Sequence, residues 1–203
     1  MPSSRNWLKQ HANDHYVKQA RKLGLRSRAA FKLKEIQTKH KFIKANDHVI
    51  DLGAAPGSWS EMCMTWLNSN TLVACDLLEM QHIDGVNFIQ GDFNEPEIQK
   101  QILENFQGLP DVIISDMSPN KTGVKKVDQW QSTALCEVVL EFASEYLRPG
   151  GNLLFKSFHG DGFEEILKIA RSLFGKVKSV KPDASRKNST EIYLLCLAKK
   201  DKA

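Results

Sequence analysis

A lysine inside an apolar run is the most informative feature of the sequence. Lys156 interrupts Asn152–Phe158, which otherwise has the composition of a buried parallel strand. An unpaired buried ammonium is strongly unfavourable, so Lys156 requires carboxylate partners or a functional cavity. Asp116 directly follows the apolar run 111–115, and adjacent parallel strands would bring these two side chains together. Such a lysine can accept a proton as a general base or stabilise a developing negative charge.

Two further charged residues belong to this candidate reaction centre. Glu191 opens the apolar run 191–198, and Lys32 lies in the basic N-terminal region. Two positive and two negative groups could therefore converge on one pocket. From the residues alone, a catalytic centre is favoured, and a structural ion-pair network is the alternative.

A second candidate site follows the apolar run 49–52. Asp51 is followed by Gly53, two alanines, a proline and Gly57 before a helix predicted to begin at Ser58. Small residues let a ligand approach the backbone, and doubly wound sheets bind ligands beyond the carboxyl ends of their strands. The loop lacks the glycine patterns that hold diphosphates, so the expected ligand has no polyphosphate. A tight turn without a ligand is the alternative interpretation.

Two aspartates suggest an adenosine at this loop. Asp76 ends the second predicted strand, where a carboxylate can accept both ribose hydroxyls. Asp92 follows the third predicted strand and could meet an adenine edge. Each alone is more typical of a turn or a helix cap, and the combination with the small-residue loop favours a binding site.

The predicted elements indicate an α/β fold that can position these residues. Seven strands are predicted at 49–52, 71–75, 86–90, 111–115, 152–158, 176–180 and 191–198. Amphipathic stretches predict helices at 27–39, 58–67, 77–85, 95–107, 127–147 and 163–173. This alternation is typical of a doubly wound, mostly parallel sheet with helices on both faces. The loop 182–190 suits an antiparallel last strand at the sheet edge.

Composition narrows the class of protein. The 203 residues suit one domain, and the chain has no apolar run long enough to cross a bilayer. The four cysteines are far apart and lie mostly in apolar segments, which predicts core thiols and no metal site. We therefore expect a cytoplasmic protein, without membrane contact, that acts as a monomer.

Positive charge is concentrated at the N-terminus. Residues 1–44 contain 12 Lys and Arg against two acidic residues, with Trp7, Tyr16 and Phe31 interleaved. Basic side chains neutralise phosphates, and aromatic rings stack on bases. We therefore predict that 1–44 is an RNA-binding extension packed on a catalytic domain, 45–203. Basic loops expected to extend this surface contain Lys121, Lys125, Lys126, Lys181, Arg186 and Lys187.

Nearly the whole chain resembles the FtsJ/RrmJ-type family of RNA methyltransferases. The matching segments are Arg26–Ile36, Asp51–Ser60, Ala74–Leu78, Gly91–Phe93, Ser115–Asn120, Lys156, and Pro182–Arg186 with Glu191. The sequence departs from the family pattern at Ser58, where a second glycine is usual, and at Ala30. Neither departure removes a group that the chemistry needs.

The resemblance implies a Rossmann-like S-adenosylmethionine methyltransferase fold. It implies a catalytic tetrad of Lys32, Asp116, Lys156 and Glu191, and a cofactor site that includes Gly53, Gly57, Trp59, Asp76, Asp92 and Asp116. It further implies methylation of a ribose 2′-hydroxyl, on a uridine of large-subunit ribosomal RNA in the assembled subunit. Lys156 would act as the general base or as an electrostatic stabiliser of the alkoxide.

Other functions remain as alternatives. The same chemistry on transfer RNA would use the same tetrad, and a noncatalytic, RNA-binding ribosome assembly factor would need only the basic extension. A base methyltransferase is disfavoured because Asp116–Asn120 lacks the aromatic residue that stacks on a flipped base. A nicotinamide oxidoreductase is disfavoured by the loop pattern.

Overall fold

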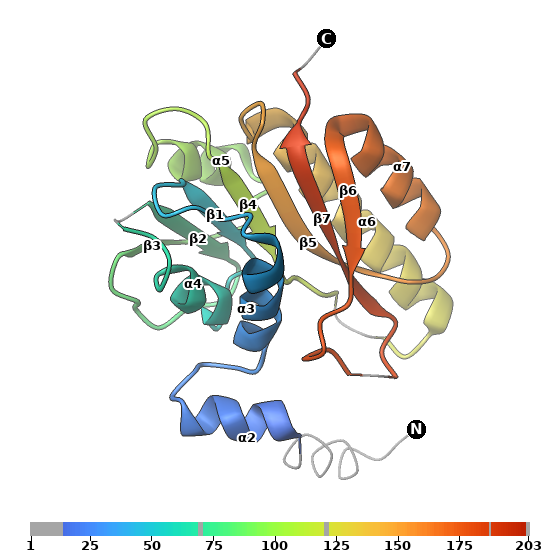
Figure 1. Ribbon diagram of the computed structural model, residues 1–203. Coiled ribbons are helices and arrows are strands. Elements are labelled where there is room, and N and C mark those ends of the chain that lie inside the picture. Colours follow the sequence, from blue (N-terminus) through green and yellow to red (C-terminus); the bar gives the residue numbers. More distant parts are fainter. Residues whose placement is uncertain (1–13, 69–70, 120–121, 187, 202–203) are drawn as a thin grey trace.

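A mixed sheet forms the centre of the molecule (Figure 1). The computed structural model describes residues 14–68, 71–119, 122–186 and 188–201. Within them, seven strands pair in the order β3-β2-β1-β4-β5-β7-β6. The strands are β1 Val49–Leu52, β2 Leu72–Asp76, β3 Val86–Gln90, β4 Val112–Ser115, β5 Asn152–Phe158, β6 Phe174–Val180 and β7 Glu191–Lys199.

The direction of β7 decides which residues reach the functional edge of the sheet. β1 to β5 are parallel, whereas β7 is antiparallel to both β5 and β6. Only residues 181–190 connect β6 to β7, which is too short for a parallel crossover. Because β7 is reversed, its first residues lie where the other strands end. The predicted fold and the antiparallel last strand are confirmed, although β7 lies between β5 and β6 and β6 forms the outer edge.

Helices cover both faces of the sheet, as predicted. Figure 1 shows α3 and α4 in front of the sheet and α6 and α7 behind it. Two separate apolar clusters result, one beneath α3 and α4 and one beneath α5, α6 and α7. The helices are α2 His15–Lys22, α3 Ala29–His40, α4 Ser58–Cys63, α5 Pro96–Leu103, α6 Lys125–Tyr146 and α7 Phe163–Leu173. All four cysteines are buried free thiols, and no described helix could span a membrane.

The helix predicted at 77–85 is wrong, because this segment is a loop. Arg26 donates hydrogen bonds to the carbonyl oxygens of Gln81, at 3.0 Å, and His82, at 2.8 Å. A side chain thus satisfies backbone groups that a helix would pair internally. Met80 is buried and lies against Gly57. The apolar residues that suggested a helix therefore include one that packs over the small-residue loop.

The N-terminal region joins the sheet through α3. Ala30, Leu33 and Ile36 of this helix are fully buried in the same apolar cluster as the front face of the sheet. Before it, the Asp14 side chain accepts a hydrogen bond from the backbone N–H of Tyr16 at 3.0 Å and caps α2. Trp7, predicted to contribute to RNA binding, lies outside the described residues, as do Lys121 and Lys187.

Candidate active site

Strand register places Asp116 and Lys156 beside each other. Ser115, the last residue of β4, pairs with Phe155 of β5. The next residues along these parallel strands are Asp116 and Lys156. On the other side of β5, Tyr193 of the reversed β7 pairs with Lys156. Three neighbouring strands thus deliver polar side chains to one edge.

The four predicted tetrad residues form a ring of alternating charge. Lys156 Nζ lies 2.8 Å from Asp116 Oδ1, donates to the Asp116 carbonyl at 2.6 Å, and lies 4.0 Å from Glu191 Oε2. Lys32 Nζ lies 2.8 Å from the other oxygen of Glu191. The Lys156 side chain is only 8% exposed. Each buried charge therefore has an opposite charge within reach, which offsets the cost of removing it from water.

Glu191 is held ionised by its neighbours. Burial alone would raise the pKa of this carboxyl group, but Lys32 and Lys156 outweigh burial and lower it. The Ser185 hydroxyl also donates to Glu191 Oε1 at 2.7 Å. The carboxylate therefore remains a fixed acceptor between the two lysines at neutral pH.

Tyr193 is a member of the site that the sequence analysis missed. Its hydroxyl accepts a hydrogen bond from Lys32 Nζ at 3.0 Å and donates one to Asp116 Oδ1 at 2.5 Å. Burial, together with Asp116 and Glu191, raises the pKa of Tyr193 well above its usual range, so the hydroxyl remains protonated. The available signal was its position two residues after Glu191, which places both side chains on one face of a strand.

A small cavity lies next to the tetrad at the end of β1. Its volume is about 120 Å³. It is lined by Ser27, Ala29, Asp51, Gly53, Ala54, Ala55, Pro56, Ser58, Trp59 and Asp116. Asp116 thus borders both the cavity and the lysine ring. Gly53 and Gly57 have φ values of +71° and +98°, which favour glycine, and a Cβ at Gly57 would approach Ile83 and Met80 within 2.8 Å.

Asp51 places a titratable carboxyl group in this cavity. The side chain is almost fully buried, and Ser60 Oγ donates to Oδ2 at 2.6 Å. Burial, with smaller contributions from Asp116 and Asp76, raises the pKa of Asp51 to about 7. A cation in the cavity would favour the ionised form.

Trp59 supports the cavity wall. Its indole N–H donates to the carbonyl of Ala29 at 2.9 Å, and its ring lies 5.7 Å from the ring of Tyr193, centroid to centroid. Ser58 stands where the family pattern usually has a second glycine. Its hydroxyl donates a hydrogen bond to the hydroxyl of Ser27 at 2.7 Å. These contacts join α4 to the start of α3 behind the cavity.

The two aspartates predicted to bind adenosine lie at the ends of adjacent strands. Asp76 accepts hydrogen bonds from the backbone N–H groups of Ala55 and Leu78, both at 2.8 Å. Asp92 accepts from the Asn94 backbone at 3.0 Å and from its side chain at 2.8 Å. Asp76 is therefore tied to the small-residue loop, whereas Asp92 stabilises its own turn.

A larger hollow, of about 490 Å³, opens on the other side of the tetrad. Ser118, just after Asp116, Phe158, just after Lys156, and Thr190, before Glu191, contribute to its wall. Lys125 and Lys126, at the start of α6, also line it. Because Asp128 and Asp161 also line it, the hollow is a polar space of mixed charge, large enough for a nucleotide to enter beside the reaction centre.

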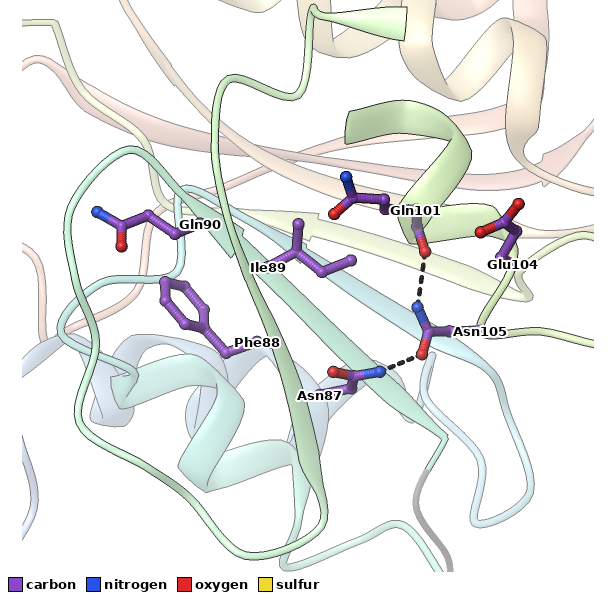
Figure 2. Close-up of a pocket in the computed structure, with 7 residues that line it drawn as sticks. All are labelled: Asn87, Phe88, Ile89, Gln90, Gln101, Glu104 and Asn105. Atoms are coloured by element: carbon purple, nitrogen blue, oxygen red, sulfur yellow. Dashed lines mark hydrogen bonds between the residues drawn. The ribbon is translucent and has the colours of Figure 1, made fainter. Parts of the chain in front are cut away.

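A hollow of similar size lies between β3 and α5 (Figure 2). Figure 2 shows Asn87 and Asn105 hydrogen-bonded to each other at its rim. Two strands, β2 and β1, separate β3 from β4 in the sheet. Glu104 is the one ionisable residue that lines it. Its distance from the tetrad and its lining make it a poor candidate for the reaction centre.

Among the residues described, His, Cys, Asp and Glu form no group of three that could hold a metal ion.

A cavity for a small ligand beside a buried lysine–carboxylate ring, at the carboxyl edge of this sheet, is the arrangement of a methyltransferase. The FtsJ-like methyltransferase family matches residues 25–199, and the chain belongs to it.

The sequences and structures of similar proteins align with this chain over most of their length. Two curated relatives named "Ribosomal RNA large subunit methyltransferase E" come from Methylobacillus flagellatus, 47% identical over 98% of both chains, and from Pseudomonas fluorescens, 49% identical over 95% of this chain and 93% of the relative. A crystal structure described as a ribosomal RNA methyltransferase from Plasmodium falciparum is 29% identical, with a TM-score of 0.75 over 87% of this chain and 100% of the other.

Proposed function

We propose that this protein uses S-adenosylmethionine to methylate the 2′-hydroxyl of a uridine in ribosomal RNA of the assembled large subunit. The observation that carries the proposal is the ring of Lys32, Glu191, Lys156 and Asp116 beside the cavity at the end of β1. The names of the relatives support ribosomal RNA as the substrate. We further propose that the protein acts in the cytoplasm as a monomer.

The residues around the cavity fit this methyl donor. Asp51 and Asp116 line the cavity and would offset the positive charge of a sulfonium, and the small residues of the loop would leave the backbone accessible to the cofactor. Asp76, held by Ala55, would accept from the ribose hydroxyls, and Asp92 would lie near the adenine. S-adenosylmethionine supplies an electrophilic methyl group on a sulfur that leaves as a neutral thioether.

The tetrad would position the attacking ribose oxygen. Lys156 Nζ is held by two oxygens of Asp116, and we assign it the stabilisation of the developing alkoxide. The hydroxyl proton passes to solvent as the O–CH₃ bond forms. Lys32, fixed by Glu191 and Tyr193, holds the target nucleotide, and alignment alone can contribute several kcal/mol, on the order of 7.

RNA would approach through the basic side of the molecule. Helix α3, which carries Lys32, and the hollow lined by Lys125 and Lys126 border the tetrad. Neutralised phosphates would contribute most of the affinity, while the hollow accepts the target nucleotide.

The test is methyl transfer from methyl-tritiated S-adenosylmethionine to large subunits isolated from cells that lack the enzyme. We expect label on a single ribose 2′-oxygen of a uridine, lost with Lys156→Ala and retained with Lys168→Ala, an exposed lysine on α7. Labelled transfer RNA with unlabelled subunits would reassign the substrate. Cofactor binding without transfer to any RNA would contradict the enzymatic proposal and favour a noncatalytic RNA-binding factor.

A further inference from the structure

A groove of about 360 Å³ runs between α3 and the outer strand β6. Its walls carry Glu35, Lys39 and His40 from α3, and Lys178 from β6, with Lys181 just beyond the end of that strand. Four basic residues therefore face one acidic residue in a concave surface outside the tetrad.

The groove and the active site lie along the same helix, α3. Lys32, Glu35, Ile36, Lys39 and His40 have the i, i+3, i+4, i+7, i+8 spacing that places side chains on one face of a helix. Lys32 occupies the tetrad end of this face, and Lys39 lies seven residues later. At 1.5 Å per residue, this spacing corresponds to about 10 Å along the helix axis.

The acidic residue in the groove, Glu35, already accepts hydrogen bonds from the protein backbone. Both carboxylate oxygens of Glu35 accept hydrogen bonds from the backbone N–H of Asp183, at 3.0 and 2.9 Å. Glu35 thereby fastens the loop after β6 to α3 and forms the rim between the groove and the tetrad. Its charge is partly offset by this bond, so the groove remains favourable for an anion.

His40 orients the lysine on the opposite wall. Lys178 Nζ lies 3.3 Å from His40 Nδ1. Burial, followed by Lys178 and then Lys39, lowers the pKa of His40, so its ring is neutral at pH 7 and accepts from the ammonium. Because an ammonium has three donors, Lys178 can still donate to an anion while the imidazole holds it.

We propose that this groove binds a backbone phosphate of the substrate RNA, about three nucleotides from the methylated ribose. The distance follows from the 10 Å offset and a phosphate spacing of about 3.4 Å along a stacked strand. Lys39 and Lys178 are the principal contacts. The inference rests on the proposed function.

The test compares short RNAs that contain the target uridine and extend by one to six nucleotides on either side. Binding is measured by fluorescence anisotropy for the wild type, Lys39→Ala/Lys178→Ala, and the matched control Lys100→Ala/Lys168→Ala, whose exposed lysines lie on α5 and α7. Lys178→Gln, which keeps a donor near His40, checks that any loss does not come from local unfolding.

The groove variant should lose affinity only for RNAs that extend at least about three nucleotides on one side. Losing the one neutralised phosphate should reduce the slope of log K against log salt by about 0.7, which corresponds to about 5-fold in Kd at about 0.1 M salt. The KM for long RNA should rise with kcat and cofactor affinity unchanged, and the control double variant should match the wild type.

Several results would overturn the inference. An unchanged salt slope, or equal loss for short and long RNAs, excludes a separate distal phosphate contact. Weaker binding to whole subunits with unaltered binding to naked RNA would assign the groove to an acidic protein surface instead. If the wild type itself transfers no methyl group to RNA, the proposed function fails, a result that the binding series distinguishes from failure of the groove.

Discussion

The two halves of the functional edge hold their charges in different ways. Where β4 and β5 end and the reversed strand β7 begins, lysines and carboxylates pair with each other, as Lys156 does with Asp116. At the ends of β1 and β2, carboxylates accept from hydroxyl and backbone N–H groups, as Asp51 does from Ser60 and Asp76 from Ala55. The first half is electrically balanced before any substrate arrives. The second is negative, which suits a cationic ligand and leaves its charge sensitive to pH.

Lys156→Ala should separate the two halves most strongly. We expect kcat to fall by about 10²- to 10⁴-fold, the range for loss of a positioned catalytic group. Cofactor affinity should stay within about twofold, because Lys156 does not line the cavity. Single-turnover transfer and calorimetric cofactor titration measure the two effects. If Lys156→Arg restores most of the rate, the stabilising role is supported, and an inactive arginine variant would instead favour a neutral lysine base.

Asp76→Ala should weaken cofactor binding strongly and change kcat little, the reverse of the effect expected for Lys156→Ala. Losing a carboxylate that accepts from ribose hydroxyls costs about 1.5–3 kcal/mol, or on the order of 10- to 100-fold in cofactor affinity. The rate at saturating cofactor should change little. Asp92→Ala, at the proposed adenine end of the site, should weaken cofactor binding less, because among the hydrogen bonds described Asp92 is engaged only within its own turn. Unaltered cofactor binding by Asp76→Ala would contradict the assignment of the β2 end to the ribose.

Tyr193→Phe should destabilise the side of the site where lysines and carboxylates pair, without removing a charge. The hydroxyl connects Lys32 to Asp116, and its removal should lower the free energy of unfolding by about 1 kcal/mol. We expect a drop in kcat that is smaller than that of Lys156→Ala, with a normal cofactor Kd. Denaturant melts and the same kinetic assays report both. A wild-type kcat in this variant would mean that the bridge serves stability alone.

The smallest effect that we expect to distinguish the two halves is the pH dependence of stability that arises from protonation of Asp51. Its pKa in the folded protein is raised to about 7, so its contribution to stability is fully present below the unfolded pKa of about 3.9 and is lost as pH rises to about 7. Asp51→Asn should therefore gain stability relative to wild type across that window and level off above it. Thermal melts measure this difference as a function of pH.

Cofactor binding should show the opposite pH trend. The affinity of the wild type for a sulfonium should increase as Asp51 ionises near pH 7, and Asp51→Asn should flatten this dependence. A pH-independent difference in Kd between the two proteins would argue that Asp51 lies outside the cofactor's field.

The sequence contains enough information to predict the sheet and the neighbouring positions of Asp116 and Lys156. A lysine in an apolar strand requires partners, and parallel strands that end together supply them. The position of β7 between β5 and β6 was not predictable, because strand order depends on packing between distant segments. Tyr193 was missed although its spacing from Glu191 places both side chains on one face of the strand, because the pattern does not show that this face meets Lys32 and Asp116.

The error at 77–85 has a different origin. Its apolar residues resemble a helix stripe, but Met80 packs over Gly57 while Leu78 is exposed. Side chains from elsewhere in the chain stabilise the nonhelical path: Arg26 donates to two carbonyl groups of the loop, and Gln90 donates to the carbonyl of Leu77. Local pattern therefore could not identify a conformation that a distant side chain holds.

The reversed strand β7 also governs when the enzyme becomes active during its own synthesis. Glu191 and Tyr193 belong to the last-translated strand of the sheet, and Tyr193 bonds to Lys32 across 161 positions of sequence. Contacts this distant form late, after the local elements have collapsed. A nascent chain that has already folded α3 and the small-residue loop therefore still lacks Glu191, one of the four tetrad residues, and Tyr193, which connects Lys32 to Asp116. Activity appears with the closing of the sheet, so catalytic competence reports on complete folding.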